Sequence, residues 1–152
     1  MKQPIKRHPA LQPWSRDHHH GLLLGWKIKK GFSAGIDIQR IKDYTDWFWK
    51  SHLKQHFETE DKYIFPILGN EHPLVERALE EHERLKSFFE HPKADTEVLS
   101  EIENLLNTHI RFEERVLFQE IQKIASAEEI KLLENAHKDS LDLESWKDEF
   151  WK

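Results

Sequence analysis

A ten-residue segment occurs twice in this chain, 53 residues apart, and this repeat constrains the possible folds more than any other feature. The first copy covers residues 56–65 and the second covers residues 109–118. Each copy begins with His, has Glu at its fifth position and an acidic residue at its sixth, and ends with Phe. Because residues four apart lie on one face of an α-helix, each copy directs an imidazole and a carboxylate the same way. The repeat therefore predicts two helices with matched polar faces.

This prediction depends on the whole repeated block, because the four-residue spacing of His and Glu would by itself be weak evidence. The chain has nineteen Glu and eleven His, so such spacings also arise by chance, and His72 with Glu76 is an example. The repeat is larger than the spacing, because it also pairs Asp61 with Glu114 and aligns apolar and basic positions. We therefore take His56, Glu60, His109 and Glu113 as candidate ligands.

Glycine and proline fall mostly between long periodic segments, which is typical of long helices joined by short connections. We expect helices over about 13–29, 37–65, 73–90 and 95–124, and a capping box at Ser126 and Glu129 predicts a shorter fifth helix. Short connections make successive helices antiparallel. The predicted fold is all-α: an up-down-up-down four-helix bundle over about 11–124 with a C-terminal helical extension over about 126–152, in a single domain.

The two repeated faces also point inward in this prediction. Apolar residues follow helical spacing on both sides of His56 and Glu60, and again around His109 and Glu113. Burying carboxylates and imidazoles is costly unless they are paired. A pair of divalent cations would neutralise them, since carboxylates can bridge two metals. The chain has no cysteine, and nitrogen and oxygen ligands suit iron or manganese, with zinc as an alternative.

The other two helices of the predicted bundle each offer a histidine. On the third helix this is His82. On the first helix it is one of His18, His19 and His20. We favour His18 because it continues the face of Trp14, and His19 is the alternative. We expect His52 to be a core or supporting residue, and we place His8, His72, His91 and His137 at the surface.

This pattern resembles the hemerythrin-like family of His-His-Glu cation-binding domains, over about residues 11–124. The segments that carry the resemblance start at His56, Glu81 and His109. The resemblance implies two non-haem iron ions, one held by His18 and His56 and the other by His82 and His109, with Glu60 and Glu113 bridging them. It also implies binding of dioxygen, peroxide or nitric oxide.

One departure from the oxygen-carrying members of that family changes the expected role. Those proteins have a second histidine on the third helix, whereas here Ala78 and Lys86 occupy the positions one turn before and after His82. Six protein ligands rather than seven leave both ions open, as catalytic and sensing sites do. We expect a sensor, store or scavenger. The alternatives are a di-iron oxidoreductase served by a separate reductase, and a metal-free helical interaction module that uses the tryptophan-rich C-terminal segment.

The charge and hydropathy of the sequence limit the kinds of partner that we expect. A net charge of −5 with scattered basic residues argues against nucleic acid. No apolar run approaches the roughly 18 residues of a membrane span, and the N-terminal residues lack the apolar run of a signal peptide. We therefore expect no membrane partner and a cytoplasmic location. The oligomeric state stays open.

Overall fold

The computed structural model describes residues 6–137 and 145–152, and these residues form helices and turns without any β-strand. This confirms the all-α prediction. The α-helices are α1 (Gln12–Ser33), α2 (Ile38–Phe48), α3 (Lys54–Thr59), α4 (Pro73–Phe89), α5 (Thr96–Phe112), α6 (Phe118–Ile124) and α7 (Ala127–Ala136). Short π-helical segments cover Trp49–Leu53, Glu60–Ile64 and Glu113–Leu117, and 3₁₀ turns cover Pro9–Leu11 and Phe65–Ile67.

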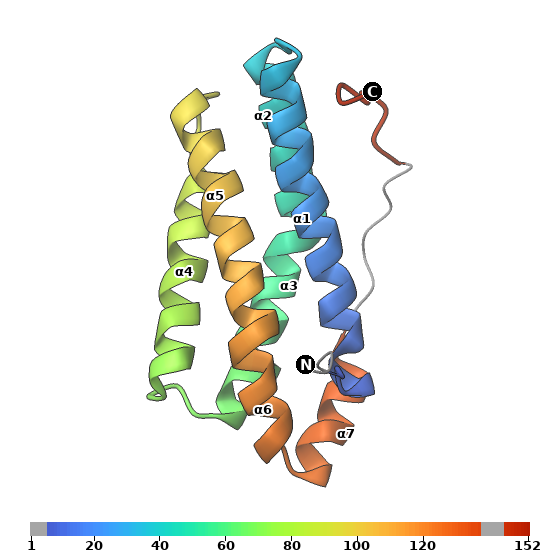
Figure 1. The fold of residues 1–152 in the computed structure, drawn as a ribbon, viewed down its shortest axis with the longest axis vertical. Coiled ribbons are helices and arrows are strands. Elements are labelled where there is room, and N and C mark those ends of the chain that lie inside the picture. Colours follow the sequence, from blue (N-terminus) through green and yellow to red (C-terminus); the bar gives the residue numbers. More distant parts are fainter. Residues whose placement is uncertain (1–5, 138–144) are drawn as a thin grey trace, which may run out of the picture.

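The π-helical segments join neighbouring α-helices into longer rods. Helices α2 and α3 follow one another without a break through residue 67, and α5 continues into α6 in the same way. Figure 1 shows α1, the α2–α3 rod, α4 and the α5–α6 rod side by side, with the chain direction alternating from one to the next. The helix α7 folds back near the N-terminal end of α1.

Side-chain caps fix where these helices begin. The Asp37 carboxylate accepts a hydrogen bond from the amide of Gln39 at the start of α2, and Asp95 caps α5 in the same way. The Ser126–Glu129 capping box is formed at α7, as the sequence predicts.

The first helix is longer than predicted, because Gly31 does not end it. A Cβ atom at Gly31 would lie 2.7 Å from Cδ1 of Ile41, so this glycine permits a close approach between α1 and α2. The turn after α1 falls instead at Gly35, whose φ of +68° is accessible to glycine at little cost.

Two apolar clusters pack the interior, and a polar layer separates them. Along α1, His18 lies between Trp14 of one cluster and Leu24 of the other. Along α4, His82 lies between Ala78 and Leu85 in the same manner. The fold thus positions histidines from different helices at one level.

The predicted helical extension over about 126–152 is correct only for α7. Residues 138–144 lie outside the described residues, and residues 145–152 form turns rather than a helix. Short isolated helices are marginal in water, so packing decides the conformation of such a segment. Here Phe150 is buried against the core, and the rings of Trp146 and Trp151 lie 5.6 and 4.9 Å from the ring of Tyr44. None of the helices that the structure describes has the length and apolar character needed to cross a membrane.

Candidate metal centre

Four histidines and two glutamates meet in the polar layer between the two apolar clusters. His18 comes from α1, His56 from α3, His82 from α4 and His109 from α5, while Glu60 and Glu113 are each the first residue of a π-helical segment. Glu60, Glu113 and His109 are fully buried, and the other three histidines are at most 4% exposed. All six predicted ligands are therefore brought together, and His18 is the first-helix histidine among them.

The six side chains form two overlapping groups that could each hold a cation. Glu60, His82, His109 and Glu113 make one group, and His18, His56 and Glu60 make the other. Within each group the ligand atoms lie within 4.8 Å of one another. Glu60 belongs to both groups, so its carboxylate is common to the two candidate sites.

The separations between ligand atoms fit a shared metal. Nε2 of His56 and Nε2 of His82 each lie 3.2 Å from Oε1 of Glu60, and Nε2 of His18 lies 3.7 Å from Oε2 of Glu60. Nitrogen and oxygen ligands that are bonded to one ion at about 2.0–2.2 Å stand roughly 3–3.6 Å apart. His109 also contacts Glu113 through Nε2. The donor atoms therefore converge on a common interior.

Most of these inward atoms have no hydrogen-bond partner in the described part of the chain. Nε2 of His18, Nε2 of His56 and all four carboxylate oxygens of Glu60 and Glu113 lack a hydrogen bond of normal geometry there. Burying such groups without partners is costly. Four imidazoles and two carboxylates are also the donor set that iron, manganese or zinc accepts. The residues present therefore fit a pair of divalent cations.

An outer set of carboxylates orients the four imidazoles. Each histidine has its Nδ1 atom within 2.7–3.1 Å of a carboxylate oxygen: His18 of Glu114, His56 of Asp17, His82 of Asp61 and His109 of Glu81. With Nδ1–H donating outward, the Nε2 lone pair faces the interior, which is how metal-binding histidines are usually held.

These carboxylates form a closed circle around the centre. Asp17 on α1 holds the histidine of α3, and Asp61 after α3 holds the histidine of α4. Glu81 on α4 holds the histidine of α5, and Glu114 after α5 holds the histidine of α1. Each helical segment thus supplies one inward histidine and one carboxylate that orients its neighbour.

Sequence reasoning did not assign a role to these four acidic residues. A signal was present, because Asp61 and Glu114 each follow a predicted bridging glutamate, and Asp17 and Glu81 each precede a predicted histidine. The contacts across helices needed the structure, since an acidic residue next to a histidine on a helix points in a different direction.

The cluster strongly favours positive charge. Burial alone would lower the pKa of His18, but the hydrogen bond that its ring donates to Glu114 and the negative charges of Glu60 and Glu113 outweigh it and raise that pKa to about 10. For His56, burial is likewise outweighed by the charge of Glu60 and the hydrogen bond to Asp17, which raise the pKa to about 9. In the metal-free protein, protons on these histidines therefore supply the positive charge that metal cations would otherwise supply.

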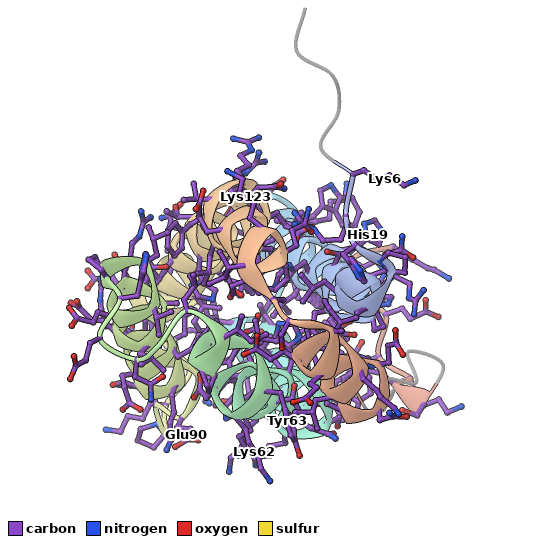
Figure 2. The ribbon with its side chains drawn as sticks, turned by 90° about the horizontal axis from the view of Figure 1, so that it is seen from below. Lys6, His19, Lys62, Tyr63, Glu90 and Lys123 are labelled. Carbon is purple, nitrogen blue, oxygen red and sulfur yellow. The ribbon has the colours of Figure 1, made fainter. Side chains whose placement is uncertain are left out.

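The other histidines lie apart from the two ligand groups. His19 is exposed, and Figure 2 shows it on the outside of α1. His52 is buried one turn before His56, and its ring lies 6.2 Å from that of His20. The surface prediction for His137 is wrong, because its side chain is only 13% exposed and its Nε2 atom lies 2.6 Å from Asp17. Its proximity to the outer carboxylate depends on how α7 packs, which the sequence pattern does not encode.

Compared with protein-family models, curated proteins and solved structures, the chain shows no significant match. The functional assignment therefore depends on the geometry of the centre.

Proposed function

We propose that this protein is a non-haem di-iron protein of the hemerythrin-like type, in which α1, the α2–α3 rod, α4 and the α5–α6 rod form an up-down-up-down four-helix bundle. The observation that carries the proposal is the double layer around the centre: four imidazoles face inward and a carboxylate holds the outer nitrogen of each. A cluster of buried histidines that served packing alone would not need both layers.

In this proposal each ion has its own pair of histidines. His18 and His56 bind one ion, His82 and His109 bind the other, and the carboxylates of Glu60 and Glu113 are shared. The membership of Glu60 in both ligand groups supports the bridging role. The outer carboxylates keep each imidazole in the tautomer that presents its lone pair to the metal.

The iron pair, when bound, supplies open coordination positions and one-electron redox chemistry. The chain does not fill those positions from α4, because Ala78 is a buried methyl group and Lys86 is exposed. The apolar clusters on both sides of the layer exclude water from the histidines and glutamates. We infer that the protein binds dioxygen, peroxide or nitric oxide as a sensor, store or scavenger.

Iron loading followed by absorption spectroscopy tests this function. The wild-type protein should show the charge-transfer bands of an oxo-bridged ferric pair after air oxidation, and these bands should change when azide is added. Glu60→Ala should abolish the bands, while Glu58→Ala, on the exposed side of the same helix, should leave them unchanged.

Two further outcomes distinguish the alternatives. Sustained peroxide turnover with an added reductant would make the protein an oxidoreductase. A melting temperature that is the same with bound metal and with a chelator would instead favour a metal-free helical module, because a ligand that binds only the folded state must raise stability.

A further inference from the structure

The two halves of the centre differ in how closely their helices pack. At the second position of the repeat, one copy has Phe57 and the other has Ile110. On the Ile110 side, a Cβ atom at Gly21 would lie 2.7 Å from Cδ1 of Ile110, so α1 and α5 are in close contact there. This face of the centre is sealed.

The Phe57 side has a cleft that reaches one candidate ligand of the centre. Its volume is about 110 Å³, and its lining includes Lys54, Phe57, Asp61, His82 and Lys86 from the α3 and α4 segments. His82 is a candidate ligand, and Asp61 is the carboxylate that orients it. By contrast, a recess beside His56 on another side has essentially no free volume and no room for a water molecule.

The ring of Phe57 lines the cleft and lies against two candidate ligands. It stacks on the imidazole of His82, with centroids 3.9 Å apart and an angle of 14° between the planes. It also lies edge-on to His109, with centroids 5.7 Å apart, and is only 5% exposed. Phe57 thus covers one face of the His82 ring at the place where the cleft adjoins the centre.

We propose that small uncharged molecules reach the metal centre through the cleft between α3 and α4, and that Phe57 is the gate. That these molecules reach a metal ion rests on the proposed function, whereas the existence of the cleft does not. A volume of about 110 Å³ admits only a few non-hydrogen atoms, since one water takes about 30 Å³ in the liquid.

The charges around the cleft do not attract anions. Two lysines, Lys54 and Lys86, face three carboxylates on Glu58, Asp61 and Glu83. The lining therefore offers no excess positive potential to concentrate an anion. Dioxygen, nitric oxide and hydrogen peroxide fit this access route better than azide or superoxide does.

Xenon in crystals of the metal-free protein tests the cleft without reference to iron. Xenon is an apolar, uncharged atom, and it should appear in the cleft beside Phe57. Phe57→Trp should abolish this site, because the larger ring fills the inner end. Xenon bound only elsewhere, or absent from the cleft, would overturn the proposal.

Nitric oxide binding to the ferrous protein tests the gate. Phe57→Leu should raise the association rate about tenfold and Phe57→Trp should lower it about tenfold, because access rather than bonding limits a gated site. Ile110→Val is the matched control at the same repeat position on the sealed face, and its rate should stay within about twofold of wild type. Variants are compared at equal iron content and equal helicity.

The effect of the charges that line the cleft can be tested separately. Glu83→Lys should speed azide binding at low salt while the nitric oxide rate is unchanged. Equal rates for the Phe57 variants, or an effect of Ile110→Val as large as theirs, would contradict the gate. If the protein bound no iron, the proposed function would fail, and the xenon experiment would still decide the role of the cleft.

Discussion

At the residue scale, each imidazole of the centre is oriented through its outer nitrogen, Nδ1. The outer nitrogen bonds to one carboxylate and the inner nitrogen faces another, as His82 does between Asp61 and Glu60. The outer carboxylate fixes the direction of the ring and increases its basicity, so it acts on the metal through the histidine.

Removing the charge of one outer carboxylate should weaken metal binding without disrupting the fold. Asp61→Asn keeps an oxygen that can accept from Nδ1 of His82 but loses the negative charge. The affinity for iron, measured by competition with a chelator, should fall about 10- to 100-fold. Glu58→Gln is the control, because Glu58 is exposed and contacts none of the four histidines in the hydrogen bonds described here. An unchanged affinity in Asp61→Asn would show that this carboxylate is not needed.

The raised histidine pKa values predict how the stability of the metal-free protein depends on pH. The pKa of His18 is raised to about 10 and that of His56 to about 9, above the ordinary value of 6.5. Such groups contribute stability fully below about pH 6.5 and lose it as the pH rises through their folded pKa values.

The free energy of unfolding of the metal-free protein, measured with urea, should therefore decrease between about pH 7 and pH 10. The free energy of unfolding of the metal-bound protein should decrease less over this pH range, because cations have replaced the protons at these histidines. A metal-free protein whose stability rose between these pH values would contradict the charge arrangement of the cluster.

At the element scale, helix starts could be predicted from the sequence and the π-helical segments could not. Asp95 and Ser126 mark starts through side-chain caps that depend only on neighbouring residues. The segments Glu60–Ile64 and Glu113–Leu117 lie inside helices that read as continuous. Their widened turns begin at Glu60 and Glu113, and π-helical turns are frequent at functional sites. Their positions depend on packing across the centre, which local patterns do not contain.

The close approach of α1 and α5 can be tested with a pair of substitutions. Gly21→Ala places a methyl group 2.7 Å from Cδ1 of Ile110, and overpacking of this kind costs about 1–3 kcal/mol. Ile110→Val removes Cδ1 and should recover part of that loss in the double variant. The free energies of unfolding of the four proteins form a double-mutant cycle. Purely additive effects would show that the two side chains do not compete for this space.

At the scale of the whole molecule, the repeat allowed four of the six clustered residues to be predicted as a matched set. His82 was predicted as the histidine that the third helix offers, and His18 was favoured over His19 because it continues the face of Trp14. His19 is exposed in the structure. The outer carboxylates were missed because the chain has 28 acidic residues and few of them can be singled out by local pattern. The C-terminal turns were missed because an amphipathic pattern does not reveal that Phe150 packs sideways against α1 and α2.

The C-terminal segment should stabilise the fold without contributing to the centre. Phe150 is 4% exposed, and its ring lies 5.9 Å from that of Tyr44 in the apolar cluster that also contains Leu24 and Leu85. Phe150→Ala should lower the free energy of unfolding by about 3–5 kcal/mol. The amount of iron bound by the folded variant should equal that of wild type. Loss of iron from a folded Phe150→Ala protein would show that this segment supports the centre directly.

The most direct test of the account is the iron content of the folded chain, measured by native mass spectrometry after anaerobic loading with ferrous iron. The wild-type protein should retain about two ions per chain, as a pair of adjacent sites with shared carboxylates requires. Glu60→Ala should retain fewer, because that carboxylate belongs to both ligand groups, while Glu58→Ala should retain the full number. A wild-type chain that keeps no iron, or the same content in wild type and Glu60→Ala, would contradict the di-iron centre.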